Sequence, residues 1–464
     1  MRRLRLAVAL TCFAMGSAYA AEPTQNDDLI AKGKYLAIAA DCGACHTAPE
    51  QGKPMAGGYA IQSPLGNIIA SNITPSKIAG IGDWSEEDFA RAVREGINKD
   101  GQHLYPAMPY TSYAKISDED IHALYAYFMH GVAPVDQQVA ETELPFPFNI
   151  RSAMAGWNML FADNQRFTPR ADVSAQINRG DYLVNALEHC DTCHTPRNAL
   201  MGQDNSKALS GGSLGSWYAP NITPDKLSGI GNWSEQDLAQ YLKTGHVAGK
   251  AQAAGPMAEA VEHSLQYLSD EDINAMVAYL RQIPAVNTGN GPARESMGKP
   301  AVDEMTQRGL GDKADAGWQV FSSSCANCHQ TGGQGTEQYP SLFHNTTTGA
   351  DRADNLIATI LYGVHRTVNG EGIAMPAFGP DADWTEQLND QQIADVSNYV
   401  LKTYGNAELS VTPEQVKLIR EGGEKPLIAK LTGPVPFGIA VIVLILIVIA
   451  VVRASRRNKN GSAK

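Results

Sequence analysis

A five-residue pattern, Cys-x-x-Cys-His, occurs three times in the chain, at residues 42–46, 190–194 and 325–329. These three copies contain six of the seven cysteines, and the seventh, Cys12, lies close to the N-terminus. Self-similarity on this scale is typical of a structural unit that is used repeatedly. The chain is therefore expected to fold as three domains in tandem, each built around one copy of the pattern.

Longer segments repeat around the pattern. SNITPSKIAGIGDWSEEDF at 71–89 matches PNITPDKLSGIGNWSEQDL at 220–238, and SDEDIHALYAYF at 117–128 matches SDEDINAMVAYL at 269–280. The third unit keeps only a looser counterpart of the latter, NDQQIADVSNYVL at 389–401.

Helical signals dominate every unit. A helix-like segment with a glycine and a large residue precedes each pattern, and a helix is predicted to close each unit. Ser117 and Ser269 are expected N-caps of closing helices, with Asp120 and Asp272 at the capping-box position. No alternating strand run of useful length is recognised. The expected fold class is all-α, with three small helical domains in tandem at 21–150, 166–285 and 301–406.

Three chemistries compete for a Cys-x-x-Cys-His pattern. Structural zinc needs four ligands, and no second ligand pair accompanies any copy. A thioredoxin-like disulfide needs a βαβ unit, which the helical pattern does not provide. Covalent haem uses every element, because the two thiols bond to the porphyrin vinyl groups and the histidine ligates the iron. Haem is the favoured interpretation for His46, His194 and His329.

A second axial ligand is expected late in each unit, most often a methionine. Met108 and Met375 each precede a proline in loop-like sequence, and Met257 lies in register with Met108. Met276 is the rival in the second unit, although its place on the closing helix favours a core role. Histidine ligation is less favoured; the candidates are His103, His246, His263 and His365.

Weaker signals surround the haem candidates. Arg197 is a candidate partner for a haem propionate. The segments beginning at Asn72 and Asn221 are expected to form loops at a haem edge. Trp84 and Trp233 could face the haem ring, but a role in core packing is the favoured interpretation.

The two ends of the chain carry targeting patterns. Residues 1–20 combine basic residues, an apolar stretch and a small-x-small site, which predicts a signal peptide that includes Cys12. Residues 431–452 are uncharged and long enough to cross a bilayer, and a basic tail follows at 453–464. The positive-inside rule then predicts a periplasmic body, joined by a linker at 407–430 to a single C-terminal anchor in a bacterial inner membrane.

The formal net charge is −12. An acidic body argues against nucleic acid as a partner.

Together, the three Cys-x-x-Cys-His units, CHTPRN at 193–198, the NITP and GIG-x-W segments and the late Met-Pro pairs resemble one family. It is the triple-haem cytochrome c subunits of bacterial membrane-bound alcohol, gluconate 2-, fructose and aldehyde dehydrogenases. The resemblance implies three covalently bound haem c groups, one for each unit. Its ligand sets are Cys42, Cys45, His46 and Met108; Cys190, Cys193, His194 and Met257; and Cys325, Cys328, His329 and Met375.

The same resemblance implies what the chain works with. The partner is a periplasmic catalytic subunit with a flavin, a quinone cofactor or a molybdenum centre, together with a small third subunit in some complexes. Electrons pass to ubiquinone, and this chain carries no substrate chemistry. The alternatives are a free-standing membrane-anchored electron carrier, a terminal-oxidase subunit and a haem peroxidase. A methionine available in all three units argues against the peroxidase, which needs an open iron position.

Overall fold

Each repeat folds around two helices that cross at a glycine. The computed structural model describes residues 25–49, 52–430 and 438. The crossing pairs are α1 (Gln25–Ala39) with α5 (Asp118–His130), α7 (Ala175–Tyr182) with α11 (Asp270–Leu280), and α13 (Ala316–Val320) with α16 (Asp390–Tyr404). A Cβ atom on Gly33, Gly180 or Gly317 would lie 1.9, 2.0 or 2.1 Å from a carbonyl oxygen of the closing helix. Glycine therefore sets how closely each pair approaches.

The predicted N-caps of the closing helices are confirmed. The side chains of Ser117 and Ser269 accept hydrogen bonds from the backbone N–H groups of Asp120 and Asp272. In the third unit Asn389 caps α16 and forms a full capping box with Gln392. The capping side chains satisfy N–H groups that the first turn of a helix leaves unpaired, which explains why the helices begin at these residues.

Short helices carry the three patterns. The first two patterns lie on α2 (Cys42–His46) and α8 (Cys190–His194), the latter preceded by a π-helical turn at Leu183–Leu187. The third begins at the last residue of a π-helical turn, Phe321–Cys325, and continues on α14 (Ala326–His329). The other helices are α3 (Glu86–Glu95), α4 (Tyr110–Tyr113), α6 (Ala153–Phe161), α9 (Glu235–Thr244), α10 (Pro256–His263), α12 (Glu304–Leu310), α15 (Asp354–Tyr362), α17 (Pro413–Arg420) and α18 (Leu427–Lys430).

The all-α prediction is wrong in one respect, because the described chain also contains four two-stranded antiparallel hairpins. They are β1 (Ala60–Ser63) with β2 (Gly66–Ile69), β3 (Gly212–Leu214) with β4 (Trp217–Ala219), β5 (His246–Val247) with β6 (Ala251–Gln252), and β7 (Val364–Val368) with β8 (Glu371–Met375). The last of these hairpins has a local turn signal in the sequence, Asn369-Gly370. Asn369 and Gly370 both adopt positive φ at its turn, and burial alternates along β7.

The transmembrane helix of the predicted fold class is also corrected. No helix that the structure describes is long and apolar enough to cross a membrane. The longest described helices, α1 and α16, have 15 residues each, whereas a span needs ~20. The predicted span 431–452, apart from Gly438, the tail 453–464 and the signal 1–20 lie outside the described residues. The segment 407–430, predicted as a linker, contains α17 and α18, and Val416 and Ile419 of α17 are buried in the core of the third unit.

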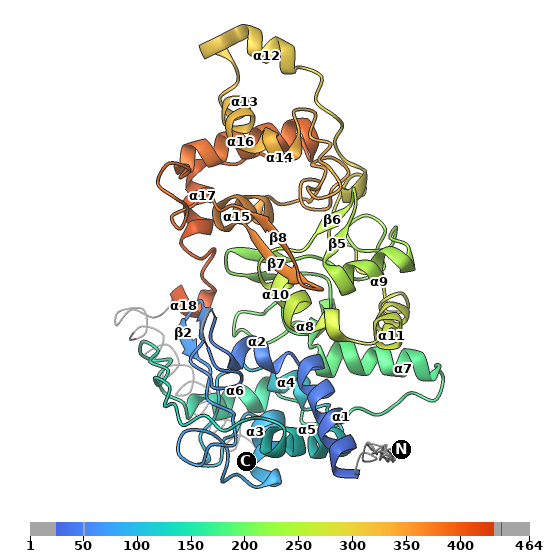
Figure 1. Ribbon diagram of the computed structural model, residues 1–464, viewed down its shortest axis with the longest axis vertical. Helices are drawn as coiled ribbons and strands as arrows, with labels where there is room; N and C mark the ends of the chain where they lie inside the picture. The colour runs from blue at the N-terminus through green and yellow to red at the C-terminus, as the bar shows by residue number, and fades with distance from the viewer. Residues whose placement is uncertain (1–24, 50–51, 431–437, 439–464) are drawn as a thin grey trace, which may run out of the picture.

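The second unit lies between the other two. Figure 1 shows the first unit at the bottom in blue, the second in green and the third in orange at the top. Buried side chains of the first and second units form one continuous core, whereas the third unit has its own. The β7–β8 hairpin docks the third unit on the second, since the Arg366 guanidinium donates to the Ala253 carbonyl at 2.7 Å and Gln266 bonds the backbone of Thr367 and Asn369.

Candidate functional site

A cavity in the second unit brings the predicted haem residues together. Its volume is about 460 Å³, within the range of small-molecule and cofactor sites. Cys190, Cys193 and His194 line it on one side, and Met257 lines it from α10. Apolar side chains form most of the remaining wall, among them Ile222, Ile230, Trp233, Leu238, Leu242 and Leu265. This lining of thiols, an imidazole, a thioether and apolar side chains fits a covalently attached haem.

Each pattern histidine is held in the orientation that an iron ligand needs. The Nδ1 atoms of His46, His194 and His329 lie 2.7, 2.6 and 3.0 Å from backbone carbonyl oxygens. Those carbonyls belong to Ser71, Pro220 and Pro340. With Nδ1–H donating to a carbonyl, Nε2 keeps its lone pair for a metal.

Burial also keeps the histidines neutral. It lowers the pKa of His194 to about 4 and the pKa values of His46 and His329 below their usual range, although the carbonyl partners act in the opposite direction. Neutral imidazole is the form that ligates iron, so burial and orientation prepare all three side chains for the same task.

The six pattern cysteines are free thiols in the structure. Burial raises the pKa of Cys42, Cys45 and Cys325 to about 12. Zinc binding and disulfide exchange both need thiolates, which such surroundings disfavour. Among the described residues, no group of three or more His, Cys, Asp or Glu side chains is placed to hold a metal ion. The groups present in each unit, two thiols and a neutral histidine, are those that covalent haem attachment uses.

The predicted sixth ligands occupy three different settings. Met108 lies just before α4, Met257 lies in the first turn of α10, and Met375 is the last residue of β8. Only Met108 matches the loop setting expected from sequence. In the second unit both Met257 and the fully buried Met276 line the cavity. Methionine ligation at Met108, Met257 and Met375 stays a prediction.

The weaker signals have different outcomes in the structure. Arg197 donates to the carbonyls of Thr192 and Met201, and it does not line the cavity. The side-chain amides of Asn72 and Asn221 donate hydrogen bonds to the carbonyls of Val135 and Val286, in the segments that follow the closing helices. Both asparagines stabilise their loops, and the loop that begins at Asn221 also lines the cavity through Asn221 and Ile222, in agreement with the expectation for that loop. Trp233, by contrast, faces the cavity, and its buried indole nitrogen Nε1 has no partner among the described residues.

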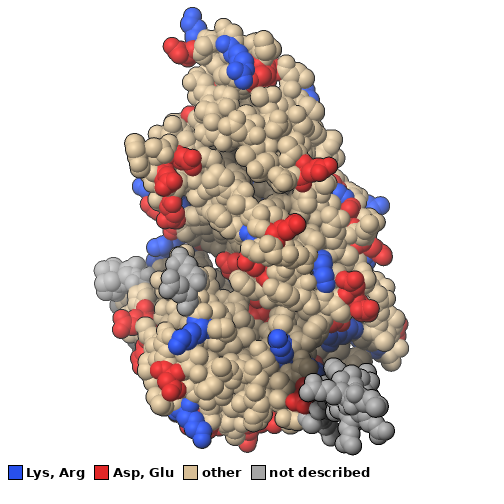
Figure 2. Space-filling model, viewed as in Figure 1, with Lys and Arg blue, Asp and Glu red and all other residues tan. Residues whose placement is uncertain are grey.

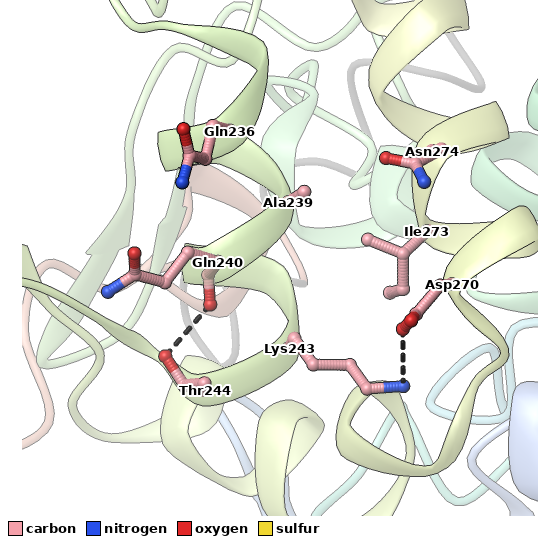
Figure 3. A pocket seen from close by; sticks show the side chains of 8 residues that line it. All are labelled: Gln236, Ala239, Gln240, Lys243, Thr244, Asp270, Ile273 and Asn274. Carbon is pink, nitrogen blue, oxygen red and sulfur yellow. Dashed lines mark hydrogen bonds and ion pairs between the residues drawn. The ribbon is translucent and has the colours of Figure 1, made fainter.

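A second hollow, between α9 and α11, has a volume of about 330 Å³ and carries none of these features. Figure 3 shows its polar walls, with Lys243 reaching Asp270 across the opening at 3.5 Å. Cysteine, histidine and methionine are absent from the residues that line it. On the face seen in Figure 2, cationic and anionic side chains are interspersed, which gives that face no single-sign field.

Comparison with known proteins agrees with the site. The profile of the family described as Cytochrome c matches residues 30–131, 177–284 and 314–403. The fructose dehydrogenase cytochrome subunit of Gluconobacter japonicus is 49% identical over 87% of this chain and 85% of its own. The gluconate 2-dehydrogenase cytochrome c subunit of Pantoea cypripedii is 41% identical over 89% and 94%. The cytochrome c subunit of alcohol dehydrogenase (quinone) from Gluconobacter oxydans is 36% identical over 91% and 88%.

The fold and its three sites define a multihaem c-type cytochrome, an electron-transfer protein that carries three haem c groups. Within that class, the chain belongs to the triple-haem cytochrome c subunits of bacterial membrane-bound dehydrogenases. Haem supplies a one-electron centre whose potential depends on axial ligand, burial and hydrogen bonding. The chain supplies the thiols, the oriented histidines and the apolar walls that keep water from the ring.

A buried carboxyl beside the second cavity yields a testable pH effect. Glu188 Oε1 lies 2.8 Å from Ser264 Oγ, which also lies 2.6 Å from the Ile38 carbonyl oxygen. One hydroxyl proton cannot serve both acceptors, so a protonated Glu188 that donates to Ser264 satisfies the group. Burial raises the pKa of Glu188 well above its usual value, in agreement.

E188Q is expected to stabilise the protein at neutral pH. Because the folded-state pKa is raised, wild-type stability is complete below pH ~4.5 and falls as pH rises, by up to about 1.4 kcal/mol per pH unit. Glutamine keeps a donor for Ser264 without this proton cost. Denaturant unfolding at pH 5 and pH 8 should show a larger gain at pH 8. An equal gain at both values would mean that Glu188 is ionised in the fold.

Proposed function

We propose that this chain is the electron-transfer subunit of a dehydrogenase complex that faces the periplasm, and that it passes electrons from a catalytic subunit to ubiquinone. The observation that carries the proposal is the single packed body of three haem units. The first two units share a core, and the third is hydrogen-bonded to the wall of the second. Haem sites held in fixed positions next to one another suit the relay of electrons from haem to haem. A carrier that diffuses between partners needs only one haem.

The partner is proposed to be a flavin, quinone-cofactor or molybdenum dehydrogenase, with or without a small third subunit. The relatives that share 49% and 41% of their residues with this chain are named for fructose and gluconate 2-dehydrogenases. A sugar or sugar acid is therefore the first substrate class to test for the partner. No chemistry on such a substrate is assigned to this chain.

The haem units are proposed to work outside the cytoplasm, at the periplasmic face of the inner membrane. The basic and apolar pattern of residues 1–20 supports export. Protease added to intact spheroplasts should cut the haem units, and a periplasmic marker serves as the control. Protection that persists until the cells are lysed would place them in the cytoplasm.

Purification of the chain from detergent-solubilised membranes tests the partner. A dehydrogenase is expected to elute with it in fixed ratio, and its cofactor will identify the substrate class. If the chain instead elutes alone with three haems, it is a free-standing carrier. If it elutes with an oxygen-reducing core, it is a terminal-oxidase subunit.

Replacing Met375 with leucine tests the third site's place in the relay. Methionine raises haem potential, so its loss should lower the potential of one haem in three and slow quinone reduction by about tenfold or more. Met305 is 79% exposed on α12, and Met305→Leu is the matched control. An unchanged spectrum would exclude Met375 as a ligand. A changed spectrum with an unchanged rate would remove the third haem from the path.

A further inference from the structure

A buried arginine lies where the third unit packs on the second. Arg366 belongs to β7 of the docking hairpin, which Figure 1 shows beside α10, and it is 2% exposed. Val364 and Val368 lie on the same face of the strand and are also buried. A strand face packed against a neighbouring unit ordinarily carries apolar side chains, and Arg366 departs from that rule.

The Arg366 guanidinium has one hydrogen-bond partner among the described residues. Its Nη1 donates to the carbonyl oxygen of Ala253 at 2.7 Å, whereas Nε and Nη2 have no acceptor. Gly245 leaves room for the group, because a Cβ atom there would lie 2.9 Å from both Nε and Cζ of Arg366. Burying a cation without a hydrogen-bonded carboxylate is costly, so the fold keeps a charge where packing alone favours a hydrophobic side chain.

One anion lies near this cation in the described part of the chain. Burial lowers the pKa of Arg366, and the charges of Tyr241 and Glu262 act in the opposite direction. Tyrosine is neutral at physiological pH, which leaves Glu262 as the anion. Glu262 Oε2 accepts a hydrogen bond from the Thr367 N–H at 3.1 Å and none from the guanidinium. The Arg366 charge is therefore only partly offset.

A second cation, Arg294, also lies near Tyr241. The carboxylates of Glu295 and Asp351 both lie near Arg294 and offset its charge. Of these two arginines, Arg366 thus has fewer anions around it.

Arg366 lies directly behind the wall of the second unit's cavity, although it does not line the cavity itself. Tyr241, Gln252 and Ala254 belong to that wall. Ala253, whose carbonyl accepts the hydrogen bond from Arg366, lies between two of these residues in the sequence. The positive charge is therefore separated from the second haem site by a single layer of the protein.

The same hairpin leads to the third haem site. Strand pairing places Val364 opposite Met375, the predicted ligand of the third haem. Arg366 lies two residues further along β7, a distance of about 7 Å at the usual rise of a strand. The cation therefore lies at the junction of the second and third haem sites, and it is hydrogen-bonded to the second.

We propose that the buried Arg366 cation raises the reduction potential of the haem in the second unit. The step concerned is the uptake of one electron by oxidised haem, and no bond or proton at Arg366 changes in it. A nearby positive charge destabilises oxidised haem, which carries one more positive charge than reduced haem, and burial limits the screening of this effect by salt. The inference rests on the haem content of the chain and is independent of the dehydrogenase partner and the quinone acceptor proposed above.

R366M tests the charge, because methionine is flexible and apolar and suits the buried face between Val364 and Val368. It should lower the potential of one haem. The expected change in the reduction equilibrium is about tenfold, equal to about 59 mV for one electron. R366K keeps the charge and should leave the potential near the wild-type value at pH 6.

Spectroelectrochemical titration of the full-length detergent-solubilised chain measures these potentials. Haem content is determined first, and the absorbance is fitted to three one-electron components. The component that also changes in Met257→Leu or Met276→Leu belongs to the second unit. Arg308→Met is the matched control, because Arg308 is an exposed arginine of the third unit in an ion pair with Glu304, and it should leave all three components in place.

The proposal is overturned if R366M leaves the second unit's component unchanged or displaces another component alone. It is also overturned if R366K at pH 6 lowers that component as far as R366M does, since the charge would then not be the cause. If R366M binds fewer than three haems, R366K decides. A buried lysine loses its proton at a lower pH than an exposed one, so the component should fall between pH 6 and pH 10 by more than in the wild type. An equal pH dependence then overturns the proposal.

Discussion

G180A is expected to destabilise the second unit by about 3 kcal/mol, because it forces an atom into a backbone contact. The added Cβ would lie 2.0 Å from the Ala275 carbonyl oxygen and 2.8 Å from Tyr279 Cβ. Both atoms belong to α11, which must move away from α7, and the core shared with the first unit would open with it. Haem content per chain should fall below three, since Cys190 and Cys193 lie on α8, which follows α7 after the π-helical turn at Leu183–Leu187. Denaturant unfolding and a haem assay measure the two effects.

Gly156→Ala is the control for this substitution. Gly156 lies within helix α6, and a Cβ atom there would meet no described atom within 4 Å. Alanine is the better helix former, so this variant should be neutral or slightly more stable. If G180A behaved like Gly156→Ala, the glycine crossing would not determine how α7 and α11 pack.

Repetition in the sequence predicted the helical framework well, because each closing helix contains its own start signal. Ser117, Ser269 and Asn389 cap their helices through atoms no more than three residues away. The hairpin at 364–375 was missed although it too is local. It has an Asn-Gly turn and buried positions at Val364, Arg366 and Val368, but the charged Arg366 at a buried position removes the apolar alternation that marks a strand.

The haem sites were predictable in part for a similar reason. Cysteine and histidine spacing lies within five residues, so the sequence alone identifies it. The carbonyl partners of the histidines, at Ser71, Pro220 and Pro340, come from loops that follow each pattern. Backbone acceptors carry no residue-specific signal. Arg366 was missed because only the packing of the third unit on the second shows that it is buried behind the wall of the second cavity.

The first two units make the same pair of hydrogen bonds to each other, once in each direction. The hydroxyl of Tyr182 donates to Asp120 at 2.7 Å and accepts from the Ser117 N–H at 3.1 Å. The hydroxyl of Tyr35, the equivalent residue of the first unit, makes the same two contacts with Asp272 and Ser269 at 2.7 and 3.1 Å.

Each tyrosine thus completes the helix cap of the other unit. The aspartate at each capping-box position accepts a hydrogen bond from the tyrosine of the other unit. Lys32 forms an ion pair with Asp120, and Arg179 forms one with Asp272, each within its own unit. The third unit has Gln319 in place of the tyrosine, two residues after its glycine, and its closing helix completes the capping box itself through Gln392. The sequence therefore predicts the cap, whereas the choice between an internal and a reciprocal cap depends on which units meet.

Y35F and Y182F should each lower the free energy of unfolding by about 1–3 kcal/mol, because each leaves a helix-starting N–H without its acceptor. Since the two units share one core, either substitution should shift a single unfolding transition of both units, and the double variant should lose the sum. Tyr267→Phe, at a tyrosine that is 58% exposed, is the matched control and should leave the transition in place. Two separate transitions, with only one displaced by each variant, would show that the first and second units fold independently and that the reciprocal caps do not join them.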